Sequence, residues 1–270
     1  MTESTSTSVV RPRAFLHEVR YERPAKGRVA AGPALRDLTF LVAPGEAVGV
    51  LGTRKDGADD VVDLVCGSTA PDRGTVYVEE SVATVTRATA FTLDESLQFN
   101  MERVAMGYGI NGAALKSTVR LVGEEAEAAE DLPRLVADCE ELVIERVRLC
   151  LALATGAPLL LLDEPAAQGR ALTSDDAAER LGRYLRQGGS MLVVSKSPRL
   201  LSQLTERSLW LHEGEVLAEG PSATVARRFR QHAQAVKDGD RNLARQLLRR
   251  FRRQHKPARY LLQEGGRRRA

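Results

Sequence analysis

The stretch Ala47–Leu64, with the sequence AVGVLGTRKDGADDVVDL, decides the fold of this chain. Its first five residues are mostly apolar and predict a buried strand, and its last residues carry apolar side chains at helical spacing. Between them, Gly52 and Gly57 have the glycine spacing of the loop G-x-x-x-x-G-K-[S/T], whose backbone N–H groups surround phosphates. The stretch therefore predicts the strand–loop–helix unit of a nucleotide-binding α/β domain.

The side chains that bind a nucleotide in that loop are replaced here. Ala58 stands at the lysine position and Asp59 at the hydroxyl position that would contact Mg²⁺. Asp60 follows, so two carboxylates lie at a helix N-terminus, which otherwise attracts an anion. Unit charges ~4 Å apart interact by about 4 kcal/mol at an effective dielectric constant of ~20. Repulsion between these carboxylates and a triphosphate, in place of attraction by a lysine, therefore predicts a large loss of triphosphate affinity. Lys55, inside the loop, either reaches a phosphate or stays solvated.

The charge of the chain changes sign along its length. Residues 1–226 contain 24 Lys or Arg and 33 Asp or Glu, whereas residues 227–270 contain 15 and 3. An acidic body that ends in a basic tail indicates a functional boundary near residue 226. With 270 residues, the chain has room for one large domain and an appendage.

The remaining composition is typical of a globular protein, with 43% hydrophobic and 28% charged residues. The three cysteines form no C-x-x-C pair, which favours buried free thiols in a reducing compartment. No apolar run reaches the ~18 residues of a membrane helix, and the polar start of the chain predicts no signal peptide.

A second strong pattern is the run Leu159–Leu162, followed by Asp163, Glu164 and Pro165. Four consecutive leucines suit a strand that is buried on both faces of a parallel sheet. Acidic residues just beyond the end of such a strand lie where α/β sheets bind ligands.

The other predicted elements follow from apolar periodicity and turn residues. Strands are expected over 15–21, 35–42, 75–78, 82–85, 191–194, 208–212 and 216–219. Helices are expected over 59–66, 93–103, 112–123, 132–154 and 174–186, the last capped by Ser174.

The order of these motifs resembles the nucleotide-binding domain of ATP-binding cassette (ABC) transporters over residues 14–226. The LLLLDEP run and the closing segment SLWLHEGEVLAEG carry the resemblance, and Glu95–Asn100 and Met106–Gly109 are most similar to the polysaccharide, O-antigen and teichoic-acid exporter branch. The resemblance to this family implies a P-loop NTPase fold with an antiparallel β layer, a central mostly parallel sheet and a helical insert at 93–155. A disordered N-terminus is expected over 1–12 and a basic helical tail over 227–270.

The resemblance also assigns roles to particular residues. Tyr21 would stack on adenine, or it packs on the β layer as an ordinary strand-end residue. Asp163 would hold Mg²⁺ and Glu164 would polarise the attacking water, or Asp163 makes structural hydrogen bonds and Glu164 has no remaining role. ATP and Mg²⁺ are therefore the implied cofactors, with weak or absent binding.

Two further motifs of the family are absent. The signature segment, which opens a helix with serine and glycine, falls on Glu140–Arg146, where there is neither. Glu141 and Glu145 would repel a phosphate there. Lys196 replaces the switch histidine and keeps only a point charge.

These combined losses predict a catalytically degenerate subunit of a polysaccharide or teichoic-acid exporter, so hydrolysis is doubtful. The alternatives are an active ATPase with unusual motifs and a scaffold that binds protein or nucleic acid. The implied partners are a transmembrane permease and a second nucleotide-binding domain, in a homodimer or with an active ATPase paralogue. The expected location is the cytoplasmic face of the membrane.

The tail segment Arg241–His255 has an apolar face surrounded by arginines. A basic amphipathic helix favours an anionic membrane surface or an acidic protein face. The acidic body of the chain is itself such a face, and nucleic acid is a third, less favoured partner.

Overall fold

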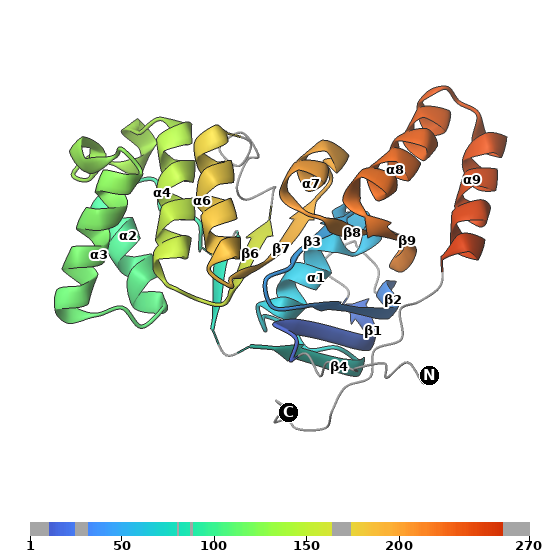
Figure 1. The fold of residues 1–270 in the computed structure, drawn as a ribbon, viewed down its shortest axis with the longest axis horizontal. Coiled ribbons are helices and arrows are strands. Elements are labelled where there is room, and N and C mark those ends of the chain that lie inside the picture. Colours follow the sequence, from blue (N-terminus) through green and yellow to red (C-terminus); the bar gives the residue numbers. More distant parts are fainter. Residues whose placement is uncertain (1–10, 25–31, 80, 87–88, 164–173, 256–270) are drawn as a thin grey trace, which may run out of the picture.

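The computed structural model describes residues 11–24, 32–79, 81–86, 89–163 and 174–255. Two β-sheets and the helices around them form this part of the chain (Figure 1). The strands are β1 (Ala14–Arg23), β2 (Gly32–Val42), β3 (Ala47–Leu51), β4 (Arg73–Val78), β5 (Val82–Val85), β6 (Leu159–Asp163), β7 (Ser190–Ser195), β8 (Arg207–His212) and β9 (Glu215–Pro221).

The α-helices cover both faces and both ends of the larger sheet (Figure 1). They are α1 (Ala58–Val65), α2 (Leu97–Gly107), α3 (Gly112–Glu125), α4 (Glu141–Ala154), α6 (Asp175–Arg186), α7 (Pro198–Leu204), α8 (Ser222–Lys237) and α9 (Arg241–Gln254). Short 3₁₀ helices are η1 (Arg54–Asp56), η3 (Ala129–Asp131) and η4 (Val136–Asp138).

The larger sheet has the strand order β5-β6-β7-β3-β8-β9 and is parallel except for its last strand, β9. The smaller sheet, β2-β1-β4, is antiparallel. The predicted α/β fold, with an antiparallel layer and a central mostly parallel sheet, is confirmed.

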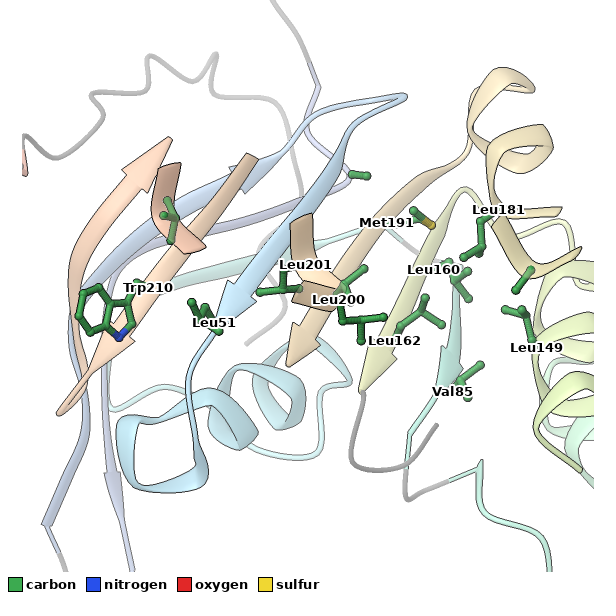
Figure 2. Close-up of a cluster of buried hydrophobic side chains, with 14 of the residues drawn as sticks. Leu51, Val85, Leu149, Leu160, Leu162, Leu181, Met191, Leu200, Leu201 and Trp210 are labelled. Atoms are coloured by element: carbon green, nitrogen blue, oxygen red, sulfur yellow. The ribbon is translucent and has the colours of Figure 1, made fainter. Parts of the chain in front are cut away.

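The leucine run of β6 fills the core on both sides of the larger sheet. Leu159 and Leu161 pack with α1 and the smaller sheet. Leu160 and Leu162 point to the opposite face, toward α6 and α7 (Figure 2). The prediction of a strand that is buried on both faces is therefore confirmed.

The helical insert has its own apolar cluster and lies at one end of the larger sheet, with the α8–α9 hairpin at the other (Figure 1). The helix predicted over 132–154 is wrong for residues 132–140, because Pro133 disfavours a helix interior and Arg134 to Ala137 instead pair with 93–97. Because residues 93 to 97 take part in this backbone pairing, α2 starts at Leu97, after its N-cap Ser96, and not at residue 93 as predicted.

The basic tail packs on the body of its own chain. Residue 226 lies inside α8, so the change of charge does not coincide with the end of an element. Phe251 of α9 is 3% exposed and belongs to the cluster that contains Trp210, and Leu247 and Leu248 pack against the same cluster. None of the helices in the described ranges combines the length and apolar character that a membrane crossing needs. The predicted disordered N-terminus falls outside the described residues up to residue 10.

Candidate phosphate-binding site

The loop between β3 and α1 lies at the carboxyl edge of the larger sheet. Leu51 at the end of β3 lies opposite Ser195 in the parallel strand β7, and the Gly52 N–H donates to the Ser195 carbonyl at 3.1 Å. Lys196 follows Ser195 directly, and Asp163 ends β6 on the other side of β7. The structure therefore brings the loop, Asp163 and Lys196 to the edge where α/β sheets bind ligands.

The two glycines of the loop are needed by its backbone and packing. Gly57 has φ of +96°, and a Cβ atom there would lie 2.4 Å from the carbonyl oxygen of Ala34. A Cβ atom on Gly52 would lie 3.3 Å from the Cβ of Leu211. The glycine spacing thus preserves the shape of the loop whether or not the loop binds phosphate.

Asp56 connects the loop to itself and to the β8–β9 turn. Its Oδ2 accepts the N–H of Thr53 at 3.0 Å and the hydroxyl of Thr53 at 2.6 Å. Its Oδ1 accepts the N–H of Glu213 at 3.2 Å and lies 3.3 Å from Nδ1 of His212. Burial opposes ionisation of Asp56, but the hydrogen bonds from His212, Thr53 and Glu213 outweigh it and lower its pKa to about 2.

The N–H groups that a phosphate loop would offer to its ligand are used within the loop. Those of Asp56 and Ala58 donate to the Thr53 carbonyl at 2.9 and 3.2 Å, and that of Gly57 donates to the Arg54 carbonyl at 3.3 Å. A triphosphate would have to replace these bonds, together with the bond from Thr53 N–H to Asp56.

The lysine and hydroxyl positions of the motif offer a nucleotide no favourable group. Ala58 is 1% exposed. Asp59 is partly exposed, and its carboxylate lies 3.8 Å from a guanidinium nitrogen of Arg54. Lys55 is exposed in η1.

Asp60, in the first turn of α1, is a buried carboxylate that forms an ion pair with Arg23 at the end of β1. The Arg23 Nε donates to Asp60 Oδ1 at 2.8 Å, and a second guanidinium nitrogen bonds the other carboxylate oxygen and also the Arg54 carbonyl. The hydrogen bonds with Asp60 raise the pKa of Arg23. The buried carboxylate of Asp60 is thus neutralised by Arg23, and the hypothesis that it fills the anion site of the loop stays a prediction.

The resemblance assigns Mg²⁺ two protein ligands at this edge of the sheet, an aspartate and a hydroxyl, and only the aspartate is present. Asp163 is buried at the end of β6, but the hydroxyl ligand is replaced by Asp59. Across the ranges that the structure describes, no group of three His, Cys, Asp or Glu side chains is arranged to hold a metal ion. Glu164 lies outside the described residues, so its role stays a prediction.

A partly buried cation lies near Asp163. The guanidinium of Arg148 in α4 donates to the carbonyl of Thr86 at 2.7 Å. Burial lowers the pKa of Arg148, while the charges of Glu145 and Asp163 oppose that change. The protein therefore places its own positive charge within electrostatic range of the aspartate that the resemblance assigned to Mg²⁺.

Tyr21, Lys196 and the start of α4 are the other positions to which the resemblance assigned roles. Tyr21 is half-buried and packs against the core under the smaller sheet, and its stacking on adenine stays a prediction. Lys196 is exposed at the end of β7. At the N-terminus of α4, Glu140 and Glu141 are exposed and Glu145 is buried, so carboxylates occupy the helix start that the signature motif would open.

Sequence reasoning missed Arg23, Arg148 and His212 as parts of this site. Arg23 and Asp60 are 37 residues apart, and His212 lies on a different element from Asp56. The one available signal was the surplus of carboxylates in and after the loop, since buried carboxylates need cationic or N–H partners.

The fold and the position of this loop define the class: the chain has the fold of an ATP-binding cassette. A solved dimer of the ATP-binding cassette MJ0796 bound to ADP and Pi matches 77% of this chain and 98% of its own, with a TM-score of 0.66 and 18% identity. No family model matches the chain.

Among curated proteins, the chain is similar to the teichoic acids export ATP-binding protein TagH of Listeria monocytogenes. The two are 20% identical over 196 residues, which are 73% of this chain and 58% of the Listeria protein. The hemin import ATP-binding protein HmuV of Pseudomonas putida is 29% identical over 199 residues, covering 67% of this chain and 78% of HmuV. The predicted resemblance to ABC nucleotide-binding domains, and to their teichoic-acid export branch, is confirmed.

Proposed function

We propose that this chain is the ATP-binding-cassette subunit of a teichoic-acid-type exporter, and that it acts as a structural or regulatory subunit instead of an ATPase. Its similarity to teichoic acid export proteins supports the exporter role. The observation that supports the second part is the phosphate loop, in which N–H groups that a triphosphate would need donate to Asp56 and to carbonyls of the loop itself.

A nucleotide would have to displace groups of the loop that are already paired. A carboxylate at the hydroxyl position, ~4 Å from a phosphate, adds about 4 kcal/mol of repulsion, and Ala58 supplies no cation to offset it. Because each 1.4 kcal/mol is roughly a tenfold change in affinity, the loop would bind Mg-ATP several orders of magnitude more weakly than an intact one.

The second half of an ATP site is also unfavourable in this proposal. In a pair of cassettes, each ATP is held between one phosphate loop and the opposite signature segment. Here the α4 start carries Glu140 and Glu141, which would repel the γ-phosphate of a partner's ATP. Both composite sites of a dimer would therefore be impaired.

The partners in this proposal are a transmembrane permease and a second cassette, at the cytoplasmic face of the membrane. Exposed apolar side chains on the helical insert, Leu93, Phe99 and Leu135, offer a contact surface for another protein. A degenerate subunit of this kind would depend on an active paralogue for any energy from ATP.

Affinity purification of the chain from its native membranes tests the exporter role. The expected result is co-purification of a permease and a second ATPase. Recovery of the chain without any membrane protein, under conditions that keep other transporters intact, would contradict the exporter role and favour the scaffold alternative.

A further inference from the structure

The hairpin of α8 and α9 carries a large positive charge. Between residues 227 and 255 there are ten Lys or Arg and two Asp residues. Arg252 pairs with Glu215 of the body at 2.9 Å. Arg241, Arg245, Arg249 and Arg253 recur at intervals of four along α9 and are all exposed, so they form one stripe. Among the described residues, none of these four forms an ion pair with an acidic side chain.

The apolar face of α9 is not available to a partner. Ala244 and Phe251 are buried, and Leu247 and Leu248 pack on the body. The Phe251 ring lies against Trp210, and the guanidinium of Arg228 stands 5.6 Å from its centre. The helix is thus fixed to the body by one face, and the arginine stripe is presented on the other.

The tip of the hairpin combines exposed apolar and basic side chains. Val236 is 57% exposed and Leu243 is 43% exposed, on either side of the turn between the helices. Lys237 and Arg241 lie beside them and are exposed. In Figure 1 this turn projects away from both sheets, so the tip is the part of the hairpin farthest from the body.

The two acidic residues of the turn are already used by the hairpin itself. Asp240 caps α9 by accepting the N–H of Leu243 at 2.8 Å. Asp238 accepts the side-chain amide of Gln234 at 2.7 Å. The outward charge of the tip is therefore positive.

We propose that the α8–α9 hairpin binds the surface of an anionic lipid bilayer, with Val236 and Leu243 entering the headgroup region and the arginine stripe on the lipid phosphates. Apolar side chains flanked by basic ones suit this boundary. Single-stranded nucleic acid fits the hairpin less well, because proteins bind its bases with exposed aromatic rings. Phe229 of the hairpin is half-buried, and Phe251 is buried. The proposal stands on the hairpin alone and does not depend on the proposed function.

Co-sedimentation of the full chain with vesicles tests this proposal. Wild type should bind vesicles of phosphatidylcholine with phosphatidylglycerol, and not vesicles of phosphatidylcholine alone, and added salt should weaken the binding. The triple variant Arg245→Glu, Arg249→Glu, Arg253→Glu should bind about a hundredfold more weakly, because each basic residue near an anionic surface contributes roughly fivefold.

A matched control makes the same change of net charge elsewhere. Arg73, Lys116 and Arg199 are exposed basic residues of the body, and their combined replacement by Glu should leave vesicle binding within about threefold of wild type. Trp210 lies against α8 and α9, so its unchanged fluorescence in each variant shows that the hairpin is still docked.

A second variant, Val236→Ser with Leu243→Ser, changes the tip without changing charge and should lose binding at moderate salt while keeping it at low salt. Three results would overturn the proposal: no binding to anionic vesicles, equal loss in the stripe variant and the control, or binding of duplex DNA in place of vesicles.

Discussion

At the scale of a single residue, Asp60 shows how the chain neutralises a buried carboxylate next to the loop. The residue is 5% exposed, and two nitrogens of Arg23 bond its two carboxylate oxygens. A charge buried this deeply is tolerated only with a hydrogen-bonded partner. The identity of that partner could not be predicted from the sequence. Arg23 lies in the smaller sheet, 37 residues before Asp60, and no local spacing connects it to α1.

Removing Arg23 should leave Asp60 buried and unpaired. We expect Arg23→Ala to lower the free energy of unfolding by about 3 kcal/mol, toward the lower end for a buried pair because the arginine is partly exposed. Urea denaturation measures this. The control is Arg20→Ala, on the same strand as Arg23. It breaks only the exposed ion pair between Arg20 and Asp37 and should have little effect on stability. An equal loss in both variants would contradict the assignment.

Asp56 should make stability depend on pH in the acid range. Its pKa of about 2 in the folded protein lies below its ordinary value of 3.8, so the stabilisation is complete above pH ~4 and is lost as the pH falls toward ~2. Asp56→Asn should cost about 2 kcal/mol at neutral pH, and its difference from wild type should shrink as the pH falls. A difference that does not change between neutral pH and pH ~3 would show that the carboxylate charge is unimportant.

At the scale of elements, strand and helix identity followed closely from the sequence where one periodicity dominated. The four leucines of β6 and the strand–loop–helix unit around η1 and α1 are examples. The prediction failed at residues 132–140, where helical spacing of apolar residues competed with Pro133 and with pairing to a distant segment. Which alternative prevails depends on tertiary contacts that a local pattern does not contain.

Gly57 should be the least replaceable residue of the loop. Ala at this position meets both a positive φ and the Ala34 carbonyl oxygen 2.4 Å from its Cβ, so Gly57→Ala should cost at least about 2 kcal/mol of stability. Gly67 has φ of +71°, and a Cβ atom there would have no neighbour within 4 Å, so Gly67→Ala should cost about 1 kcal/mol. Thermal melting compares the two, and a larger loss at Gly67 would be inconsistent with the tight packing of the loop around Gly57.

The loop should also resist simple repair. Ala58→Lys with Asp59→Ser restores the motif's two side chains, and it would restore nucleotide binding if the loop were open. Because the loop N–H groups donate internally and Asp56 holds Thr53, we expect this pair to bind Mg-ATP weakly. Adding Asp56→Ala should increase the affinity at least tenfold, since it frees the Thr53 N–H. Titration calorimetry measures the Mg-ATP affinity of both variants. Equal affinity of the double and triple variants would contradict the inference that Asp56 keeps the Thr53 N–H from binding phosphate.

At the scale of the whole molecule, the hairpin of α8 and α9 closes the end of the larger sheet. Trp210 of β8 lies beneath Phe229 and Phe251, with ring centres 5.4 and 5.9 Å away. The composition indicated the basic tail and its amphipathic period, but it left open whether the apolar face packs on the body, a membrane or a partner. The structure shows packing on the body.

Phe251 should therefore hold the hairpin in place. Phe251→Ala should cost about 3–4 kcal/mol, because it leaves a cavity beside Trp210, and it should shift the fluorescence of Trp210, the single tryptophan of the chain. Leu243→Ala, at an exposed position on the same helix, should leave both the stability and the fluorescence nearly unchanged. A Phe251 variant with wild-type stability would show that α9 is not part of the folded core.

The central claim is that the chain's own charged groups fill its phosphate loop. Isothermal titration of the purified full chain with Mg-ATP tests it most directly. We predict no saturable binding in the micromolar range, because Ala58 and Asp59 replace the motif's cation and hydroxyl, and loop N–H groups donate to Asp56 and to loop carbonyls. A dissociation constant in the micromolar range would contradict the claim.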